Sequence, residues 1–94
     1  MASVFLKIKV ADFDKWKSVF ESHQDERKQE GMTGHSIHRP ADDPNTAIVA
    51  VRTSDLNRSR NFAGSDRVRE IMQEAGVQGP PEFWFAEDVE EKKY

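Results

Sequence analysis

The sequence of 94 residues contains one series of residues whose types and spacing could support chemistry. Phe13, Trp16, Phe20 and His23 follow one another at steps of three and four residues, and this spacing places them on one face of a helix. An imidazole at the end of an apolar helical stripe can accept a proton from a bound molecule. His23 is therefore the candidate catalytic residue, and the three aromatic residues are candidate ligand-binding residues. The alternative is that the stripe is an ordinary core contact with His23 at its edge.

The other two histidines, His35 and His38, raise the question of a metal site. Residues three apart on an extended strand point to opposite faces, so these two side chains are not expected to hold one ion. The chain contains no cysteine, which removes thiolate nucleophiles, disulfides and cysteine-ligated metals. We expect no metal site, and His38 remains a candidate for contact with a small-molecule ligand.

Trp84 lies in an aromatic run near the end of the chain. A tryptophan can stack on a planar aromatic ligand, and Trp84 is therefore a further candidate ligand-binding residue. The alternative is a place in the core or in a subunit interface. Arg39 and Arg52 could orient a carboxylate, although arginines at strand ends are usually solvated or paired with surface acids.

The composition limits the classes of partner. Lys and Arg number 14 and Asp and Glu 17, which gives a formal net charge of −3, and the two signs are mixed along the chain. Such a surface does not favour nucleic acid or an anionic membrane as a partner. The N-terminus lacks the pattern of a signal peptide, and no segment approaches the roughly 20 apolar residues of a membrane span. These features predict a cytoplasmic protein with one domain over residues 1–94.

Apolar periodicity predicts the elements that position the stripe. Residues 4–10 alternate between apolar and polar, which predicts a strand with one buried face. Asp12 stands where a helix N-cap belongs, the stripe predicts a helix from there to about Gln29, and Gly31 has the place of a left-handed C-terminal residue. Residues 35–39 are typical of a short edge strand, and residues 47–51 of a central strand covered on both faces.

The chain after residue 53 predicts a second helical segment and a last strand. Ser54 or Asp55 can cap a helix, and Gly64-Ser65-Asp66 interrupts that helix with a new cap, so two helical pieces with a kink are expected. Gly76 ends the second piece, and Gly79-Pro80-Pro81 predicts a turn before a last strand at 83–86. The charged residues 90–94 form a tail that is expected to be loose or to reach a partner subunit.

Two strand-helix-strand units of this kind predict an α+β fold. The expected architecture is ferredoxin-like β-α-β-β-α-β, with a four-stranded antiparallel sheet, both helices on one face, and the first and third strands in the centre. The other face should carry either Ile48 and Ala50 or Val49 and Val51, together with Trp84 or its flanking phenylalanines. Because such a face would be wet in a monomer, we expect a homodimer formed through the sheet face.

Three segments carry a resemblance to a known group of proteins. They are Asp12-Phe13-Asp14-Lys15-Trp16-Lys17 after the first strand, the Asp43-Pro44-Asn45 turn, and Ala75-Gly76-Val77 leading to Gly79-Pro80-Pro81 and aromatic residues. Over nearly its whole length the sequence resembles the dimeric α+β-barrel superfamily, which includes antibiotic-biosynthesis-monooxygenase-like proteins and small polyketide-cyclase-like proteins. These are recurrent patterns of a fold more than catalytic signatures.

The resemblance implies a barrel of two sheets, with a ligand cavity between the helices and the sheet of each subunit. Phe13, Trp16, Phe20 and His23 would line this cavity. Haem-degrading relatives ligate haem through a histidine on the second helix, whereas all three histidines here precede that helix. The resemblance therefore implies no haem, and we expect no cofactor.

Two functions remain open at this point. The first is a small-molecule-binding protein that acts as a cofactor-independent monooxygenase or cyclase on an aromatic or polyketide-like substrate, with His23 as the proton acceptor. Exclusion of water around a substrate enolate or phenolate would promote such chemistry without a metal. The second is a non-catalytic dimeric ligand carrier, sensor or scaffold module, in which the aromatic stripe is only core.

Overall fold

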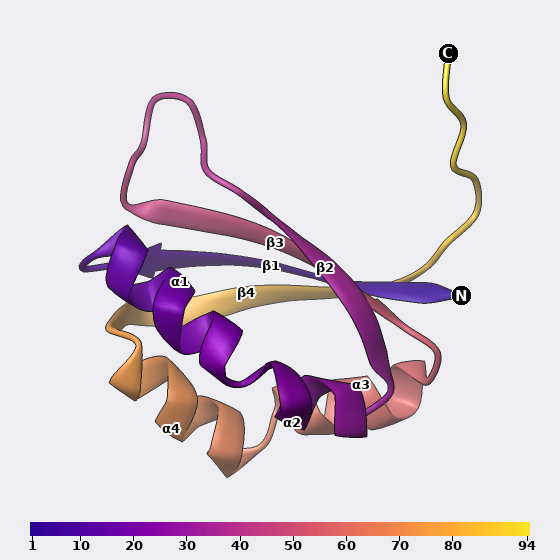
Figure 1. Ribbon diagram of the computed structural model, residues 1–94, viewed down its shortest axis with the longest axis horizontal. Coiled ribbons are helices and arrows are strands. Elements are labelled where there is room, and N and C mark those ends of the chain that lie inside the picture. Colours follow the sequence, from indigo (N-terminus) through magenta and orange to yellow (C-terminus); the bar gives the residue numbers. More distant parts are fainter.

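The chain folds as one sheet covered on a single face by four helices (Figure 1). The computed structural model describes residues 1–94. In chain order its elements are β1 (Ala2–Val10), α1 (Phe13–Ser22), α2 (Gln24–Gln29), β2 (Met32–His38), β3 (Thr46–Thr53), α3 (Leu56–Ala63), α4 (Asp66–Glu74) and β4 (Val77–Glu87). None of these helices has the length and apolar character needed to cross a membrane.

The strand order is β2-β3-β1-β4, with every neighbouring pair antiparallel. The prediction that the first and third strands are central is therefore confirmed, as is the ferredoxin-like α+β class. In the β1–β3 pair, Val4 lies opposite Val51 and Leu6 opposite Val49. Opposite residues in a sheet point to the same face, so this register gathers Val4, Leu6, Val49 and Val51 on one side.

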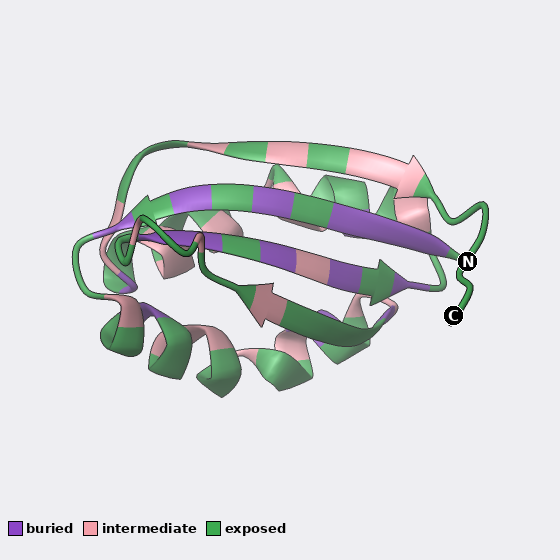
Figure 2. Cartoon of the chain, turned by 90° about the horizontal axis from the view of Figure 1, so that it is seen from above, coloured by how far each residue is buried: buried purple, intermediate pink, exposed green.

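The helix-covered face holds the hydrophobic core. The alternation along β1 appears in Figure 2 as bands of buried and exposed residues, and the buried set faces the helices, as the period of two predicts. The buried apolar residues are Val4, Leu6, Ile8, Val10, Trp16, Met32, Ala47, Val49, Val51 and Ala75. Phe83 and Phe85 of β4 pack against this set, and their rings are stacked with centroids 6.0 Å apart.

The first helical crossover is broken, and the prediction of one helix to about Gln29 is wrong. Asp12 does cap α1, because its side chain accepts a hydrogen bond from the Lys15 backbone N–H. The helix ends at Ser22, whose hydroxyl donates to the Val19 carbonyl at 2.7 Å. His23 then leaves the helical conformation, with φ −101° and ψ 18°, before α2 begins. Competition from a hydroxyl for a helical carbonyl is a known cause of bending.

The second crossover has the two pieces that its caps predict. The Asp55 side chain accepts from the Arg58 N–H at the start of α3, and the Ser65 hydroxyl accepts from the Val68 N–H at the start of α4. A buried polar contact fixes α3 to the sheet, because the Thr53 and Ser59 hydroxyls lie 2.7 Å apart. Since neither hydroxyl is exposed, their mutual hydrogen bond removes most of the cost of burying them.

The last strand is longer than expected, and the prediction of a turn at Gly79-Pro80-Pro81 is wrong. β4 runs through these residues from Val77 to Glu87. Gln78 pairs with Lys9 and Glu82 pairs with Lys7, so the segment of β4 between these pairs is two residues longer than the segment of β1. This difference is a bulge in the β1–β4 pair. Proline lacks an N–H for the ladder, and an edge strand with a bulge tolerates it. β2 is also longer than expected, since it begins at Met32.

The uncovered face of the sheet carries exposed apolar side chains. Ile48 lies opposite Lys7, and Phe5 lies between Ala50 on β3 and Trp84 on β4. The exposed fractions are 40% for Phe5, 38% for Ile48 and 50% for Trp84. Of the two arrangements that the sequence left open, Ile48, Ala50 and Trp84 therefore occupy the uncovered face, and Val49 and Val51 face the helices.

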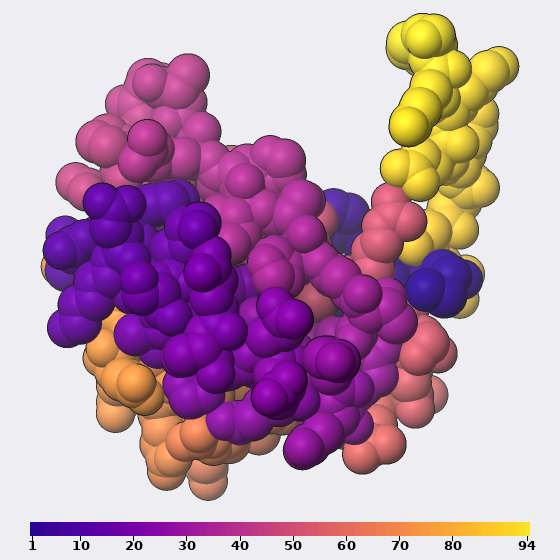
Figure 3. Space-filling model, in the orientation of Figure 1, coloured from indigo at the N-terminus to yellow at the C-terminus, as the bar shows by residue number.

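The chain after Glu87 forms neither helix nor strand. It projects from the body of the molecule in Figure 3. One ion pair joins the tail to the sheet, between Arg52 Nη2 and Glu91 Oε1 at 3.0 Å. The terminal Tyr94 is fully exposed.

Candidate functional site

A small cavity lies between the helices and the sheet. Its volume is about 90 Å³, and every helix and strand supplies at least one lining residue. The wall is apolar except for two side chains, His23 and Arg27. Ligand pockets commonly measure roughly 300–1,000 Å³, so this space takes only a small group as it stands. Met32 and Met72 belong to the wall, and methionine side chains adapt readily to a change of shape.

The aromatic stripe forms one side of this cavity. Trp16 is 3% exposed, and its ring lies 5.5 Å from that of Phe13 and 5.3 Å from that of Phe20, measured between centroids. Trp16 and Phe20 line the cavity, whereas Phe13 does not. Phe13 instead packs beneath the guanidinium of Arg39, 4.8 Å from its ring centroid. The resemblance implied that all four residues of the stripe line the cavity. Trp16, Phe20 and His23 do so, and Phe13 does not.

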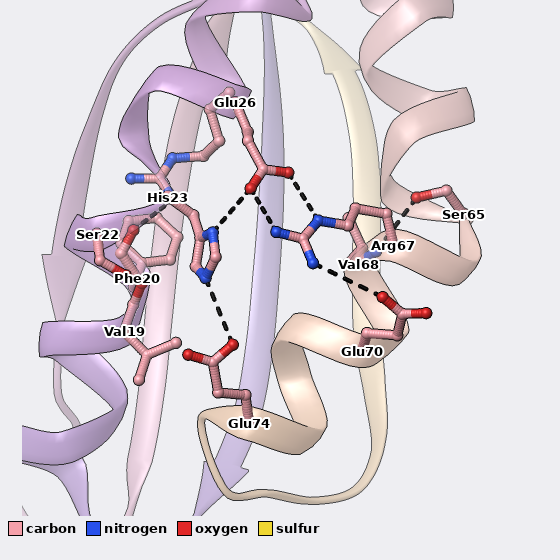
Figure 4. A network of polar contacts seen from close by, with 11 residues as sticks. Val19, Phe20, Ser22, His23, Glu26, Ser65, Arg67, Val68, Glu70 and Glu74 are labelled. Atoms are coloured by element: carbon pink, nitrogen blue, oxygen red, sulfur yellow. Dashed lines mark hydrogen bonds and ion pairs between the residues drawn. The ribbon is translucent and has the colours of Figure 1, made fainter.

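His23 lies at the junction of α1 and α2, between two carboxylates (Figure 4). Its Nδ1 is 2.9 Å from Glu26 Oε1 and its Nε2 is 3.6 Å from Glu74 Oε2. The first distance is that of a hydrogen bond and the second is too long for one. Nε2 is buried and makes no hydrogen bond, although His23 belongs to the cavity wall.

The carboxylate of Glu26 defines the tautomer of the neutral imidazole. Arg67 donates two hydrogen bonds to Glu26, at 2.9 and 2.6 Å. These bonds from Arg67, followed by the bond from His23, lower the pKa of Glu26 to about 2. An ionised carboxylate can only accept, so the proton of neutral His23 must be on Nδ1. Nε2 is then the free, basic nitrogen.

The same network connects the two helical crossovers. Arg67 on α4 also lies 3.6 Å from Glu70 (Figure 4), and its contacts with Glu26 raise the pKa of its guanidinium above the ordinary value. Residues that are 41 positions apart in the sequence thus hold the ring of His23 in place. A base whose orientation is fixed by a carboxylate follows the general pattern of oriented histidines in enzymes.

Arg27 is a site residue that the sequence reasoning did not identify. Its side chain is buried on α2, with an exposed fraction of 8%. Nη1 donates to the Phe20 carbonyl at 2.6 Å, and the guanidinium carbon lies 3.7 Å from the Phe20 ring centroid. One sequence signal was available: Arg27 follows Phe20 by seven residues and His23 by four, so it continues the helical stripe.

The remaining candidates are not brought together with His23. His38 and Trp84 lie on the uncovered face of the sheet, opposite the cavity, and His38 Nε2 is 3.0 Å from the Ser36 hydroxyl. His35 points the other way, and its ring meets the edge of Phe20 at 5.0 Å. The prediction that His35 and His38 point to opposite faces is therefore confirmed. No group of three or more His, Asp or Glu side chains has the arrangement to hold a metal ion.

Burial and the nearby charge of Arg27 lower the pKa of His35. Partial removal of this imidazole from water disfavours its cationic form, and the guanidinium adds repulsion between like charges. His35 and Arg27 also share a second pocket, of about 480 Å³, between α2 and β2.

Solved structures show which group of proteins has this fold. The chain has the fold of the antibiotic-biosynthesis-monooxygenase-like proteins. A candidate antibiotic biosynthesis monooxygenase from Bordetella bronchiseptica superposes with a TM-score of 0.76 at 15% identity, over 94% of this chain and 96% of that one. SnoaB, a cofactor-independent oxygenase from Streptomyces nogalater, superposes with a TM-score of 0.68 at 14% identity over 94% of both chains.

A third structure was solved with a bound ligand. The monooxygenase from the gene ActVA-Orf6 of Streptomyces coelicolor, in complex with nanaomycin D, superposes with a TM-score of 0.66 at 14% identity, over 99% of this chain and 91% of that one. No family model matches the sequence, and no curated protein matches it. The resemblance inferred from the sequence is confirmed at the level of the fold.

Proposed function

We propose that this chain is a small-molecule-binding enzyme of the cofactor-independent monooxygenase or cyclase type, and that it acts on an aromatic or polyketide-like substrate. The observation that carries the proposal is the free Nε2 of His23. This nitrogen is buried without a hydrogen bond, on a residue of the cavity wall. An unsatisfied buried polar atom costs about 1–3 kcal/mol, and a substrate proton donor would remove this cost.

The geometry of His23 supports removal of a proton from a phenol or an enolisable carbon. Nε2 takes the proton, and the Nδ1 bond to Glu26 keeps the ring in place during the transfer. The Glu74 carboxylate, 3.6 Å from Nε2, then stabilises the imidazolium. The apolar wall excludes water from the enolate or phenolate that is formed.

Two outcomes follow for such an anion. In an oxygenase, the anion itself supplies the electrons to dioxygen: a CH₂ group becomes a C=O group, one oxygen atom enters the product, and the other leaves as water. In a cyclase, the enolate carbon instead attacks a carbonyl of the same molecule. The fold likeness to SnoaB and to the ActVA-Orf6 monooxygenase supports the oxygenase outcome.

The active protein in this proposal is a homodimer that packs through the uncovered sheet face. Phe5, Ile48 and Trp84 supply apolar surface at its centre, and exposed apolar clusters of this kind are typical of interaction surfaces. Charges on the same face, Lys7 and Glu82, are direct neighbours across β1 and β4. A second sheet packed on this face would complete a barrel of two sheets.

One observation favours the second candidate function, a non-catalytic carrier or sensor. The cavity of about 90 Å³ is smaller than the substrate of a polyketide-type enzyme requires. In that case the dimer would bind a small ligand, or none, and His23 would serve the α2–α4 network alone.

Isotope exchange separates the two candidates. The protein is incubated in D₂O with one-ring and two-ring enolisable aromatic ketones, and loss of the α-proton signals is followed by proton NMR. The proposed function predicts exchange above the buffer rate that His23→Gln abolishes and Gln29→Ala, on the exposed side of α2, leaves unchanged. Exchange at the buffer rate with every ketone, or full exchange in a folded His23→Gln variant, would refute the enzymatic proposal.

A further inference from the structure

Arg27 is a buried cation that has no anionic partner. Its side chain is nine-tenths buried, and Nη2 is buried without a hydrogen bond. The other arginines behave differently: Arg52, Arg58, Arg67 and Arg69 each pair with an acid at the surface, and Arg39 and Arg60 are exposed. Arg27 is therefore the single arginine that is both buried and unpaired.

Burial of this kind destabilises a folded chain. Removal of a cation from water is costly unless a partner compensates, and burial lowers the pKa of Arg27 to about 10. The group is still a cation at neutral pH. Two contacts offset part of the cost, the bond to the Phe20 carbonyl and the Phe20 ring beneath the guanidinium. These contacts leave Nη2 without a hydrogen-bond acceptor, and an anionic group of a ligand would provide one.

The position of Arg27 indicates where such an anion would lie. Arg27 lines the apolar cavity together with His23, and it also lines the pocket between α2 and β2. The wall of that second pocket includes the basic Lys28 and the imidazole of His35, and it contains no acidic residue. Glu21 lies near enough to influence His35, but its carboxylate is paired with Lys17. The guanidinium thus lies between the apolar cavity and the second pocket, whose wall is basic.

We propose that Arg27 binds the oxyanion of the ligand, a carboxylate, enolate or phenolate, while the compact apolar body of the same ligand lies in the cavity beside Trp16 and Phe20. This inference rests on the site of the proposed function and specifies its ligand class. The ligand is an amphipathic monoanion and not a neutral hydrocarbon. Where the substrate becomes an anion by losing a proton to His23, Arg27 stabilises that product of the transfer.

Paired probes of equal shape test this inference on the wild-type chain. Benzoate and benzamide are titrated separately, and binding is followed by tryptophan fluorescence and by the side-chain NMR signals of Arg27. We expect benzoate to bind about tenfold more tightly than benzamide, the usual gain from one charge-assisted hydrogen bond, with the Arg27 signals shifting for benzoate alone. Equal affinity for the two probes would overturn the inference.

Substitutions extend the test. Arg27→Met should remove the preference for benzoate, chiefly by weakening the binding of benzoate, whereas Arg69→Met, which removes a surface arginine of α4, should keep the preference. A preference that survives in folded Arg27→Met would overturn the inference. If Arg27→Met does not fold, the wild-type affinities and the Arg27 signals decide the question.

Further ligands and one further variant identify the anion and separate the proposed function from the proposed role of Arg27. 4-Nitrophenolate in place of benzoate tests a phenolate source, and stronger binding than that of benzoate would assign the site to phenolates. Inorganic phosphate that displaces benzoate with equal affinity would contradict a role for the apolar body. His23→Gln should keep the benzoate preference while losing proton exchange. A chain that prefers benzoate but exchanges no protons refutes the enzymatic proposal alone, and exchange without the preference refutes the present inference alone.

Discussion

His23 donates from Nδ1 to Glu26 at 2.9 Å, and this one hydrogen bond joins the candidate base to the contact between the two helical crossovers. The acceptor oxygen of Glu26 also lies 2.6 Å from Arg67 Nη2 on α4. The orientation of the imidazole therefore depends on a contact between segments far apart in the sequence. Substitution of Glu26 therefore tests both the orientation of the His23 ring and the stability of the fold.

Glu26→Gln should lower stability in a manner that depends on pH. The pKa of Glu26 falls from 4.5 to about 2 on folding, mainly through Arg67. A carboxyl with a lowered folded pKa contributes stability that is fully present above its unfolded pKa and is lost as pH falls through the folded pKa. Because the side chain is one-third exposed, the loss at neutral pH should be about 1 kcal/mol.

The measurement is urea unfolding of wild type and Glu26→Gln between neutral pH and the limit of acid stability. The difference between the two should shrink between pH 4.5 and about 2. Asp25→Asn, which removes the neighbouring exposed carboxyl of α2 and leaves the contact between Glu26 and Arg67 in place, serves as the control. A difference that stays constant over this range would contradict the assignment of the pKa shift to the Arg67 contact.

Trp16→Ala should be among the most destabilising substitutions in the chain. The ring is 3% exposed and lies between Phe13 and Phe20, so its removal leaves a large hole. The expected loss is about 3–5 kcal/mol in the free energy of unfolding. Trp16→Phe keeps much of the packing and should lose clearly less. Equal stabilities for wild type and Trp16→Ala in chemical denaturation would mean that Trp16 is not a core residue.

Two glycines form a matched pair for backbone strain. Gly31 has φ +87°, and a Cβ placed on it would lie 3.2 Å from the Asp55 Cβ. Gly31→Ala should therefore cost about 1–2 kcal/mol or more. Gly34, in β2, has no atom within 4 Å of such a Cβ, and Gly34→Ala should be neutral or stabilise by about 0.5–1 kcal/mol. Thermal unfolding gives the melting temperatures of both variants, and that of Gly34→Ala should be higher than that of Gly31→Ala.

Trp84→Glu should convert the proposed dimer into a monomer without unfolding it. Trp84 is half exposed beside Phe5 on the uncovered sheet face, and a carboxylate there would be buried without a partner in the dimer. Light scattering coupled to size-exclusion chromatography gives the mass of each species. Trp84→Phe keeps the apolar surface and should remain dimeric. A wild-type protein that is monomeric at high concentration would disprove the dimer.

Most of the fold is predictable from local patterns in the sequence. The alternation at residues 4–10 gives β1 and its buried face, and Asp12 and Ser65 mark helix starts that the structure contains. The break at His23 has no glycine or proline signal, because it depends on the hydrogen bond of the Ser22 hydroxyl to a helical carbonyl. The strand through Pro80 and Pro81 depends on pairing along one edge, which local turn preferences do not encode.

The candidate site is less accessible to sequence reasoning. Spacing places Trp16, Phe20 and His23 on one face, and these three do line the cavity. Arg27 continues the spacing of the stripe, but it lies in a run of charged residues that is typical of a solvated helix surface, and its burial becomes evident in the structure. The pairing of Glu26 with Arg67 is a long-range contact, and no local spacing rule predicts it.

The tautomer of His23 decides whether this residue can accept a proton from a bound ligand. Correlation of the ring nitrogens with the ring protons by NMR, on wild type labelled with ¹⁵N, shows which nitrogen of the neutral imidazole carries the proton. We expect a proton on Nδ1 and none on Nε2, and the Nε2 signal should shift when phenol is added. A proton on Nε2 in the free protein, or an Nε2 signal that no phenol or ketone ligand moves, would contradict the claim that His23 presents a base to the cavity.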